Sequence, residues 1–178
     1  MPTSTALTGR SVRAVAARTA DLVNALAAPD TDPVRVEEVL RAHGEDDPVT
    51  GRDLAALREA AARIRGVLEA GTTAAAAAKV NALLAAAHPP RLTDHGGASH
   101  WHVHTDSRDD APLAEWFAAS AGLMLALLLT DRQRPPGGVC GAEGCGRVFI
   151  DTGSGSARRF CSKRCATRSR VRAHRARA

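Results

Sequence analysis

Residues 140–165 read CGAEGCGRVFIDTGSGSARRFCSKRC and hold all four cysteines of the 178-residue chain. The cysteines form two pairs, Cys140-x4-Cys145 and Cys161-x3-Cys165, with 15 residues between the pairs. Zinc prefers four ligands in a tetrahedron, and two local pairs separated by about 15–20 residues are typical of such a site. The spacing therefore predicts that these four thiolates bind one zinc ion.

Disulfides or free thiols are the alternative to zinc for these cysteines. The opening stretch MPTSTALTGR (1–10) lacks the apolar run of a signal peptide, which favours a cytoplasmic protein whose thiols stay reduced. The segment also holds few large apolar side chains, so it needs a metal or a cross-link in order to fold. Because four thiolates leave no coordination position open, the predicted role of the zinc is structural.

The residues around the cysteines predict the shape of this segment. Cys140 and Cys145 lie in a glycine-rich stretch that can fold around a metal, and residues 147–160 read as strand, turn and strand. Cys161 and Cys165 are four residues apart, so both sulfurs project from one face if a helix begins there. A knuckle, a hairpin and a helix that carries the last two ligands together predict a treble-clef-like zinc finger.

The rest of the chain is predicted to be mostly α-helical. Alanine dominates, aromatic residues make up 3% and tyrosine is absent, a composition that disfavours a large β-sandwich. Apolar periodicity and capping residues predict helices over about 11–27, 33–43, 51–70, 73–87 and 112–130, with a β-hairpin over 91–105. The apolar run 117–129 is too short to span a bilayer, so we expect a core helix there and no membrane segment.

Charge divides the chain at the stretch RQRPPGG (132–138), which reads as a linker. Residues 1–139 carry a net charge of −3, whereas residues 140–178 carry +8. We therefore expect two domains, an α-rich domain over residues 1–137 and a small zinc finger over residues 138–178.

Basic residues surround and follow the second cysteine pair. Nine of them are candidate nucleic-acid contacts: Arg158, Arg159, Lys163, Arg164, Arg168, Arg170, Arg172, Arg175 and Arg177. Like charges repel on a helix that starts near Ser162, and a polyanion relieves this repulsion while releasing its own counterions. Duplex DNA is the predicted partner, because few aromatic residues are present to stack on single-stranded bases. A solvated tail, RNA and an acidic protein surface are the alternatives.

Histidines alternate along the second strand of the predicted hairpin: His100, His102 and His104. Imidazoles at this spacing share one face of a strand and can converge on a metal or ligand, with Asp94 or Asp106 completing the set. The alternative is a strand whose histidines face solvent while Trp101 and Val103 pack inward.

Motifs of the common enzyme classes are missing from the sequence. It contains no glycine-rich phosphate loop, no Gly-x-Ser-x-Gly and no His-Glu-x-x-His. We therefore expect a protein that is not an enzyme and has no catalytic residues; an enzyme that uses the face of His100, His102 and His104 is the least favoured alternative. Asp21 and Asn24, inside the first predicted helix, are expected to be structural.

Four stretches carry a resemblance to a known family: DLVNAL (21–26), Asp32-Pro33-Val34, WHVHTDSRDDAPLAEW (101–116) and FIDTGSGSARRFCSKRCATRSRVRAHRAR (149–177). Together with the cysteine spacing, they resemble the CGNR zinc-finger family. Its members pair an N-terminal ABATE domain with a C-terminal finger and are regarded as stress-induced transcriptional regulators. The family's Cys-Gly-Asn-Arg motif stands here as Cys165-Ala166-Thr167-Arg168.

The resemblance implies both site residues and a function. By similarity, the four cysteines are the zinc ligands and the segment from Arg158 onward is the nucleic-acid face. The implied protein is a cytoplasmic regulator that binds duplex DNA through a zinc-stabilised basic helix. Its N-terminal domain would sense a small-molecule effector or form a homodimer. A finger that binds RNA or an acidic protein is the alternative.

Overall fold

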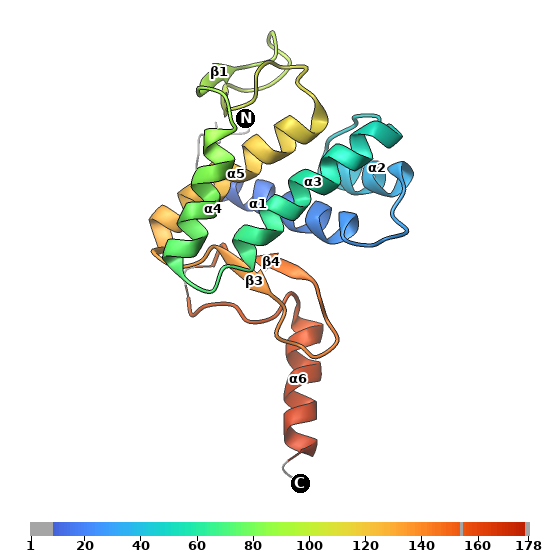
Figure 1. Ribbon diagram of the computed structural model, residues 1–178, viewed down its shortest axis with the longest axis vertical. Helices are drawn as coiled ribbons and strands as arrows, with labels where there is room; N and C mark the ends of the chain where they lie inside the picture. Colours follow the sequence, from blue (N-terminus) through green and yellow to red (C-terminus); the bar gives the residue numbers. More distant parts are fainter. Residues whose placement is uncertain (1–8, 154, 177–178) are drawn as a thin grey trace.

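The computed structural model of the chain describes residues 9–153 and 155–176 (Figure 1). Its elements, in order, are α1 (Gly9–Leu26), α2 (Pro33–Ala42), α3 (Gly51–Leu68), α4 (Thr73–Ala85), β1 (Arg91–Thr93), β2 (His102–His104), α5 (Leu113–Arg132), β3 (Gly137–Val139), β4 (Val148–Ile150) and α6 (Lys163–Arg175). Helices α1–α5 form the body, and the two hairpins lie at opposite ends of it (Figure 1). The predicted fold class, mostly α with a C-terminal zinc finger, is confirmed.

The helices of the body begin where the capping residues predict. Asp32 accepts a hydrogen bond from the Arg35 backbone N–H at 2.8 Å, and Pro33 occupies the first position of α2. Thr50 and Asp53 form a reciprocal capping box at the start of α3. All five predicted helices of the body form, and each end lies within two residues of its predicted position.

Helix α5 is the core helix of the body. It packs against α1, α3 and α4, and Phe117, Ala121 and Leu125 are fully buried. With 20 residues, the helix is longer than the apolar run alone, and by length and composition it could cross a membrane. The length argument against a membrane span is therefore wrong, and it is the packing against three other helices that supports a core helix.

The first hairpin, β1–β2, covers one end of the body with its histidine face turned inward. Arg91 pairs with His104 and Thr93 with His102, so the ladder is shorter than the sequence predicts. The alternative in which Trp101 packs inward is wrong, since this side chain is 63% exposed. Thr93 and Asp106 are buried, and both are hydrogen-bonded: Thr93 Oγ1 donates to Asp109 at 2.8 Å, and Asp106 accepts from Arg91 Nη2 at 2.7 Å.

The second hairpin, β3–β4, joins the zinc-binding segment to the body. Gly137 allows the two strands to meet, since a Cβ there would lie 2.1 Å from the Phe149 carbonyl oxygen. Val148 and Ile150 are 1% and 5% exposed and belong to the main core, where β4 packs against α1 and α3. Burying two such side chains contributes about 3–6 kcal/mol. The predicted domain boundary, between residues 137 and 138, falls inside β3.

Asn24 of α1 pairs with the backbone of β4. Its Nδ2 donates to the Val148 carbonyl oxygen at 3.0 Å, and the Val148 N–H donates to Asn24 Oδ1 at 2.8 Å. The side-chain amide thus takes the place of a neighbouring strand at an edge that would otherwise leave two backbone groups unpaired. Asp21, one turn earlier, lies 3.1 Å from His43 and 3.8 Å from Arg147. Asn24 thus has the structural role that the sequence predicts, whereas the role of Asp21, whose side chain is half exposed, stays a prediction.

We predict that Asn24→Ala lowers the free energy of unfolding by about 1–3 kcal/mol, because both backbone groups of Val148 lose their partner. Urea denaturation followed by circular dichroism measures this change. Asn81→Ala, on the exposed side of α4, is the matched control and should change the same quantity by less than about 0.5 kcal/mol. Equal stability of the two variants would show that the amide does not hold β4.

Candidate metal centre and nucleic-acid interface

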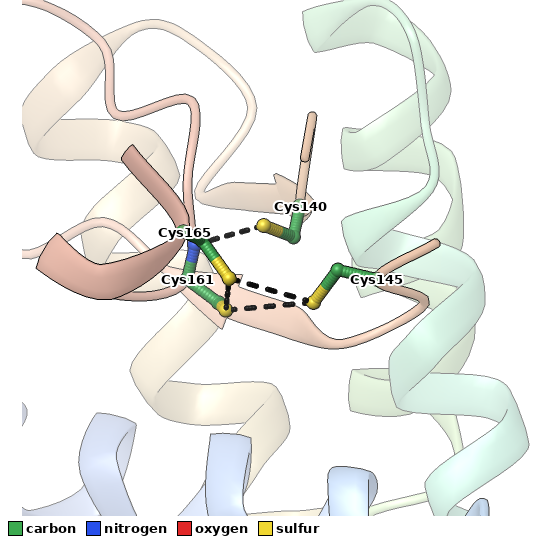
Figure 2. Close-up of side chains that lie close together, drawn as sticks. All are labelled: Cys140, Cys145, Cys161 and Cys165. Atoms are coloured by element: carbon green, nitrogen blue, oxygen red, sulfur yellow. Dashed lines mark hydrogen bonds between the residues drawn. The ribbon is translucent and has the colours of Figure 1, made fainter. Parts of the chain in front are cut away.

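The four cysteine sulfurs converge on one point (Figure 2). The Sγ atoms of Cys145, Cys161 and Cys165 are 3.6–3.8 Å apart, and all four sulfurs lie within 4.8 Å of one another. Four sulfurs placed about 2.3 Å from zinc in a tetrahedron are about 3.8 Å from each other. The geometry and the donor set therefore fit one structural zinc ion held by all four cysteines, as the spacing predicts.

Backbone turns position the first pair of ligands. Cys140 follows β3 directly, and its N–H donates to the Arg147 carbonyl oxygen at 2.9 Å. The Cys145 N–H donates to the Ala142 carbonyl oxygen at 3.0 Å. Gly144, with φ at +70°, adopts the left-handed conformation that glycine takes without strain, so the chain turns back toward the metal.

The second pair comes from a loop and from the first turn of α6. Ser162 caps this helix by accepting a hydrogen bond from the Cys165 N–H at 3.2 Å. Four thiolates around a divalent ion carry a net negative charge, which the helix dipole favours at its N-terminus. The metal centre therefore fixes both the position and the direction of α6.

A loop replaces the second strand predicted within residues 147–160. Asp151, which is 8% exposed, accepts hydrogen bonds from the backbone N–H groups of Gly153 and Arg158 and from Arg134 Nη2, at 3.1–3.2 Å. A buried carboxylate needs several donors, and a loop wrapped around it supplies them. The strand–turn–strand prediction is thus correct only for β4, which pairs with β3 instead.

The thiols of this centre differ in how readily they ionise. Burial disfavours the Cys140 thiolate, but hydrogen bonds from the backbone N–H groups of Cys161 and Ala142 outweigh burial and lower the pKa of Cys140 to about 7. Burial, followed by hydrogen bonds shared with the other sulfurs, raises the pKa of Cys161 to about 12. Crowded sulfurs resist becoming thiolates together unless a cation lies between them, and zinc is such a cation.

The fold and the centre define a helical protein that carries a structural, four-cysteine zinc finger. Residues 138–178 match the family model of the CGNR zinc finger. This match confirms the resemblance over the C-terminal part of the chain, while the resemblance of the preceding residues to an ABATE domain stays a prediction. A comparison with curated proteins found no match.

Two arginines of the predicted nucleic-acid set connect α6 to the first knuckle. Arg168, the last residue of the motif, donates from Nη2 to the Glu143 carbonyl oxygen at 3.3 Å and lies 3.9 Å from Cys165 Sγ. Arg172 pairs with the Glu143 carboxylate at 2.7 Å, and both of these side chains are about two-thirds exposed. An exposed pair of this kind contributes about 0–1 kcal/mol. Arg168 therefore supports the metal centre, and Arg172 is held only weakly.

Arg158 also supports the finger. Its Nε donates to the Phe160 carbonyl oxygen at 2.7 Å, and its Nη2 donates to the carbonyl oxygen of Cys161. The guanidinium lies 5.2 Å from the centre of the Phe149 ring. Arg159 is exposed, with its guanidinium 5.8 Å from the Phe160 ring centre. Some arginines of the predicted set, such as Arg158, form hydrogen bonds within the finger, whereas others, such as Arg159, have a guanidinium exposed to solvent.

Helix α6 projects from the body at the end formed by β3 and β4 (Figure 1). All of its charged side chains are basic. Four members of the predicted set are exposed on it, and their side chains form no hydrogen bond or ion pair with any other residue that the structure describes: Lys163, Arg164, Arg170 and Arg175. Arg177 lies outside the described residues. An exposed helix with these unpaired cations is a candidate surface for a polyanion.

The histidines at the other end of the body group differently from the prediction. His102 and His104 are neighbours, but His100 is exposed and takes no part in the group. His95, from the turn of the hairpin, takes the third place. His95 is not among the predicted residues because it precedes Gly96 in what reads as a simple turn. The available signal was its even spacing from Thr93, which places it on the histidine face.

We predict that a strong chelator unfolds α6 and the cysteine loops but leaves the body folded. Metal binding stabilises the centre, whereas Val148 and Ile150 hold the hairpin through the main core. Far-UV circular dichroism should lose helical signal equivalent to no more than the 13 residues of α6. The thermal transition of the body should persist, and its disappearance on chelation would contradict the prediction.

Zinc affinity of the finger should fall as the pH falls. Zinc binds thiolates, so lowering the pH protonates the ligands and favours release; the raised pKa of Cys161 makes proton competition strong even near neutrality. A competition titration against a chromogenic chelator between about pH 8 and pH 6 measures this dependence. An affinity that did not change with pH would mean that the thiols do not need to ionise on binding.

Proposed function

We propose that the protein is a cytoplasmic transcriptional regulator that binds duplex DNA through α6. The observation that carries the proposal is the combination of exposure and charge on this helix. It projects from the body, has no acidic residue, and presents cations that no described residue neutralises. An α-helix fits the major groove of B-form DNA, and phosphate contacts provide most of the non-specific affinity.

The spacing of the basic residues points to the side of α6 that meets the DNA. Lys163, Arg170 and His174 recur at i, i+7 and i+11, so they share one face. Arg168 and Arg172 lie on a different face and turn toward Glu143. The first face is therefore assigned to the nucleic acid, whereas Arg164 and Arg175 lie about 100–120° around the helix, between this face and that of Arg168 and Arg172.

The zinc finger restricts how α6 can approach its partner. A helix of 13 residues with many like charges is marginal in isolation. The cap at Ser162 and the zinc ligand Cys165 fix its first turn. The conformational entropy of α6 is therefore lost when the finger folds and not when the nucleic acid binds. This pre-ordering favours a specific duplex contact over the loose binding of a solvated tail.

The helical part of the chain, residues 1–137, is assigned the role of an ABATE-like sensing or dimerisation domain. The sequence resemblance supports this role, and so does a cavity of about 620 Å³ between the first hairpin, α1 and α5. A cavity of this size is in the range of sites that hold a small-molecule effector. Through β3–β4, which is buried in the main core, a change in the body could reach the finger.

We predict that the double variant Lys163→Gln, Arg170→Gln weakens binding to duplex DNA. The slope of log affinity against log salt concentration should become shallower by roughly one for each phosphate that the variant no longer neutralises. Fluorescence anisotropy over a series of salt concentrations measures both effects. Arg52→Gln, an exposed arginine at the start of α3, is the matched control and should bind as the unaltered chain does.

The same titration tests the alternative partners. Structured RNA and an acidic polypeptide serve as competitors at equal charge concentration. Stronger binding to either one than to duplex DNA, or duplex binding that does not depend on salt, would contradict the proposal.

A further inference from the structure

Three histidines outside the finger bring their Nε2 atoms together at the first hairpin. His104 Nε2 lies 2.9 Å from His102 Nε2, which in turn lies 3.2 Å from His95 Nε2. The ring centroids are 4.8–5.1 Å apart, and the ligand atoms all lie within 4.8 Å of one another. Nitrogens about 2.0–2.1 Å from a tetrahedral ion are separated by about 3.3 Å, so the observed arrangement is close to that of a three-histidine metal site.

The hydrogen bonds on the far side of each ring decide where the protons are. His104 Nδ1 lies 2.7 Å from an Asp106 carboxylate oxygen, and His102 Nδ1 lies 2.7 Å from the His100 carbonyl oxygen. His95 Nδ1 faces an Asp109 carboxylate oxygen at 3.5 Å. A carbonyl or an ionised carboxylate can only accept, so the Nδ1 atoms of His102 and His104 carry protons.

This assignment leaves the Nε2 lone pairs of His102 and His104 facing each other, with the Nε2 of His95 beside them. Adjacent lone pairs at 2.9–3.2 Å repel unless a cation lies between them. One shared proton can bridge only two nitrogens, whereas one metal ion accepts all three lone pairs. Metal-binding histidines commonly donate their second ring N–H to a carboxylate or a backbone carbonyl, as His102 and His104 do here.

The surroundings hold the cluster in this arrangement. Asp106, whose side chain is 4% exposed, is fixed by Arg91 Nη2 at 2.7 Å. Arg91 also pairs with Asp109, which accepts a further hydrogen bond from Thr93 Oγ1 at 2.8 Å. An arginine and two carboxylates thus orient the rings from behind, in the way that supporting residues orient metal ligands.

His95 adopts an uncommon backbone conformation. Its φ of +53° lies in the left-handed region, which is unfavourable for a residue with a Cβ. The two residues that follow, Gly96 and Gly97, also have positive φ. Glycine adopts this conformation without a steric penalty, so the turn uses glycine at these two positions but histidine at position 95. This turn conformation places the His95 imidazole beside that of His102, with the ring centroids 5.0 Å apart.

We propose that His95, His102 and His104 bind a second metal ion, a divalent transition metal such as Zn²⁺, through their Nε2 atoms. Three ligands leave at least one position of a tetrahedral ion for water or for a bound molecule, unlike the closed four-sulfur centre. The cluster lines the cavity of about 620 Å³, so a ligand with an oxygen or nitrogen donor could complete the coordination from that side. This site does not depend on whether α6 binds DNA.

The test is the zinc content of the full chain after equilibration with excess Zn²⁺ and removal of loosely bound ion. The unaltered chain should hold two zinc ions, and His95→Gln and His104→Ala should each hold one. His100→Ala is the matched control and should hold two, because its side chain lies outside the cluster while its backbone carbonyl is kept. Asp106→Asn should weaken the second affinity by about 10- to 100-fold.

Thermal unfolding supplies a second measurement that separates metal binding from a purely structural role. Once the finger is saturated with zinc, further Zn²⁺ should raise the unfolding temperature of the body in the unaltered chain and in His100→Ala, but not in His95→Gln. His95 lies in a turn with its side chain 32% exposed, so this variant can fold even if His104→Ala does not. One zinc per unaltered chain, or two in a folded His95→Gln variant, would overturn the proposal.

Discussion

Strand β4 is the constraint on which the rest of the structure depends, because one short strand belongs to two parts of the molecule. Its side chains Val148 and Ile150 complete the core of the body, and its backbone pairs on one side with β3 and on the other with the amide of Asn24. The same strand closes the loop that carries Cys140 and Cys145. The finger therefore does not hang on a flexible linker; it starts from a strand fixed on the body.

This arrangement separates two sources of stability. The hairpin is held by apolar burial and by hydrogen bonds to α1, whereas α6 and the loop before it depend on the metal centre. Arg158, Arg168 and the cap at Ser162 add hydrogen bonds around that centre, but none of them places α6 against the body. The core therefore fixes the β3–β4 hairpin, and the zinc site sets the direction of α6 relative to that hairpin.

Much of this could be predicted from the sequence, since the relevant signals are local. Helix limits follow capping residues such as Asp32 and Thr50, and the zinc ligands follow from spacing. The loop after β4 could not be predicted in this way, because the buried carboxylate of Asp151 collects donors from residues 134, 153 and 158. Nor could the partner of β4, because Asn24 lies more than a hundred residues away in the chain.

The basic residues and the histidines also show that contacts between residues far apart in the sequence could not be predicted. Sequence alone treats the arginines after residue 158 as equivalent, but only contacts in space separate Arg168, bound at the knuckle, from the unpaired Arg170. In the same way, alternation along one strand selects His100, whereas the fold brings His95 across from the turn. Periodicity predicts which residues share one face of a helix or strand. Which of those residues contact one another depends on how the elements pack in three dimensions.

We propose that zinc gives α6 its position and thereby the affinity for nucleic acid that we assign to this helix. The most direct measurement compares duplex DNA binding by the unaltered chain and by Cys161→Ser, which keeps every arginine but removes one zinc ligand. We expect the variant to retain the folded body but to lose the zinc of the finger and most of its affinity for DNA. A zinc-free variant that bound the duplex as tightly as the unaltered chain would contradict it.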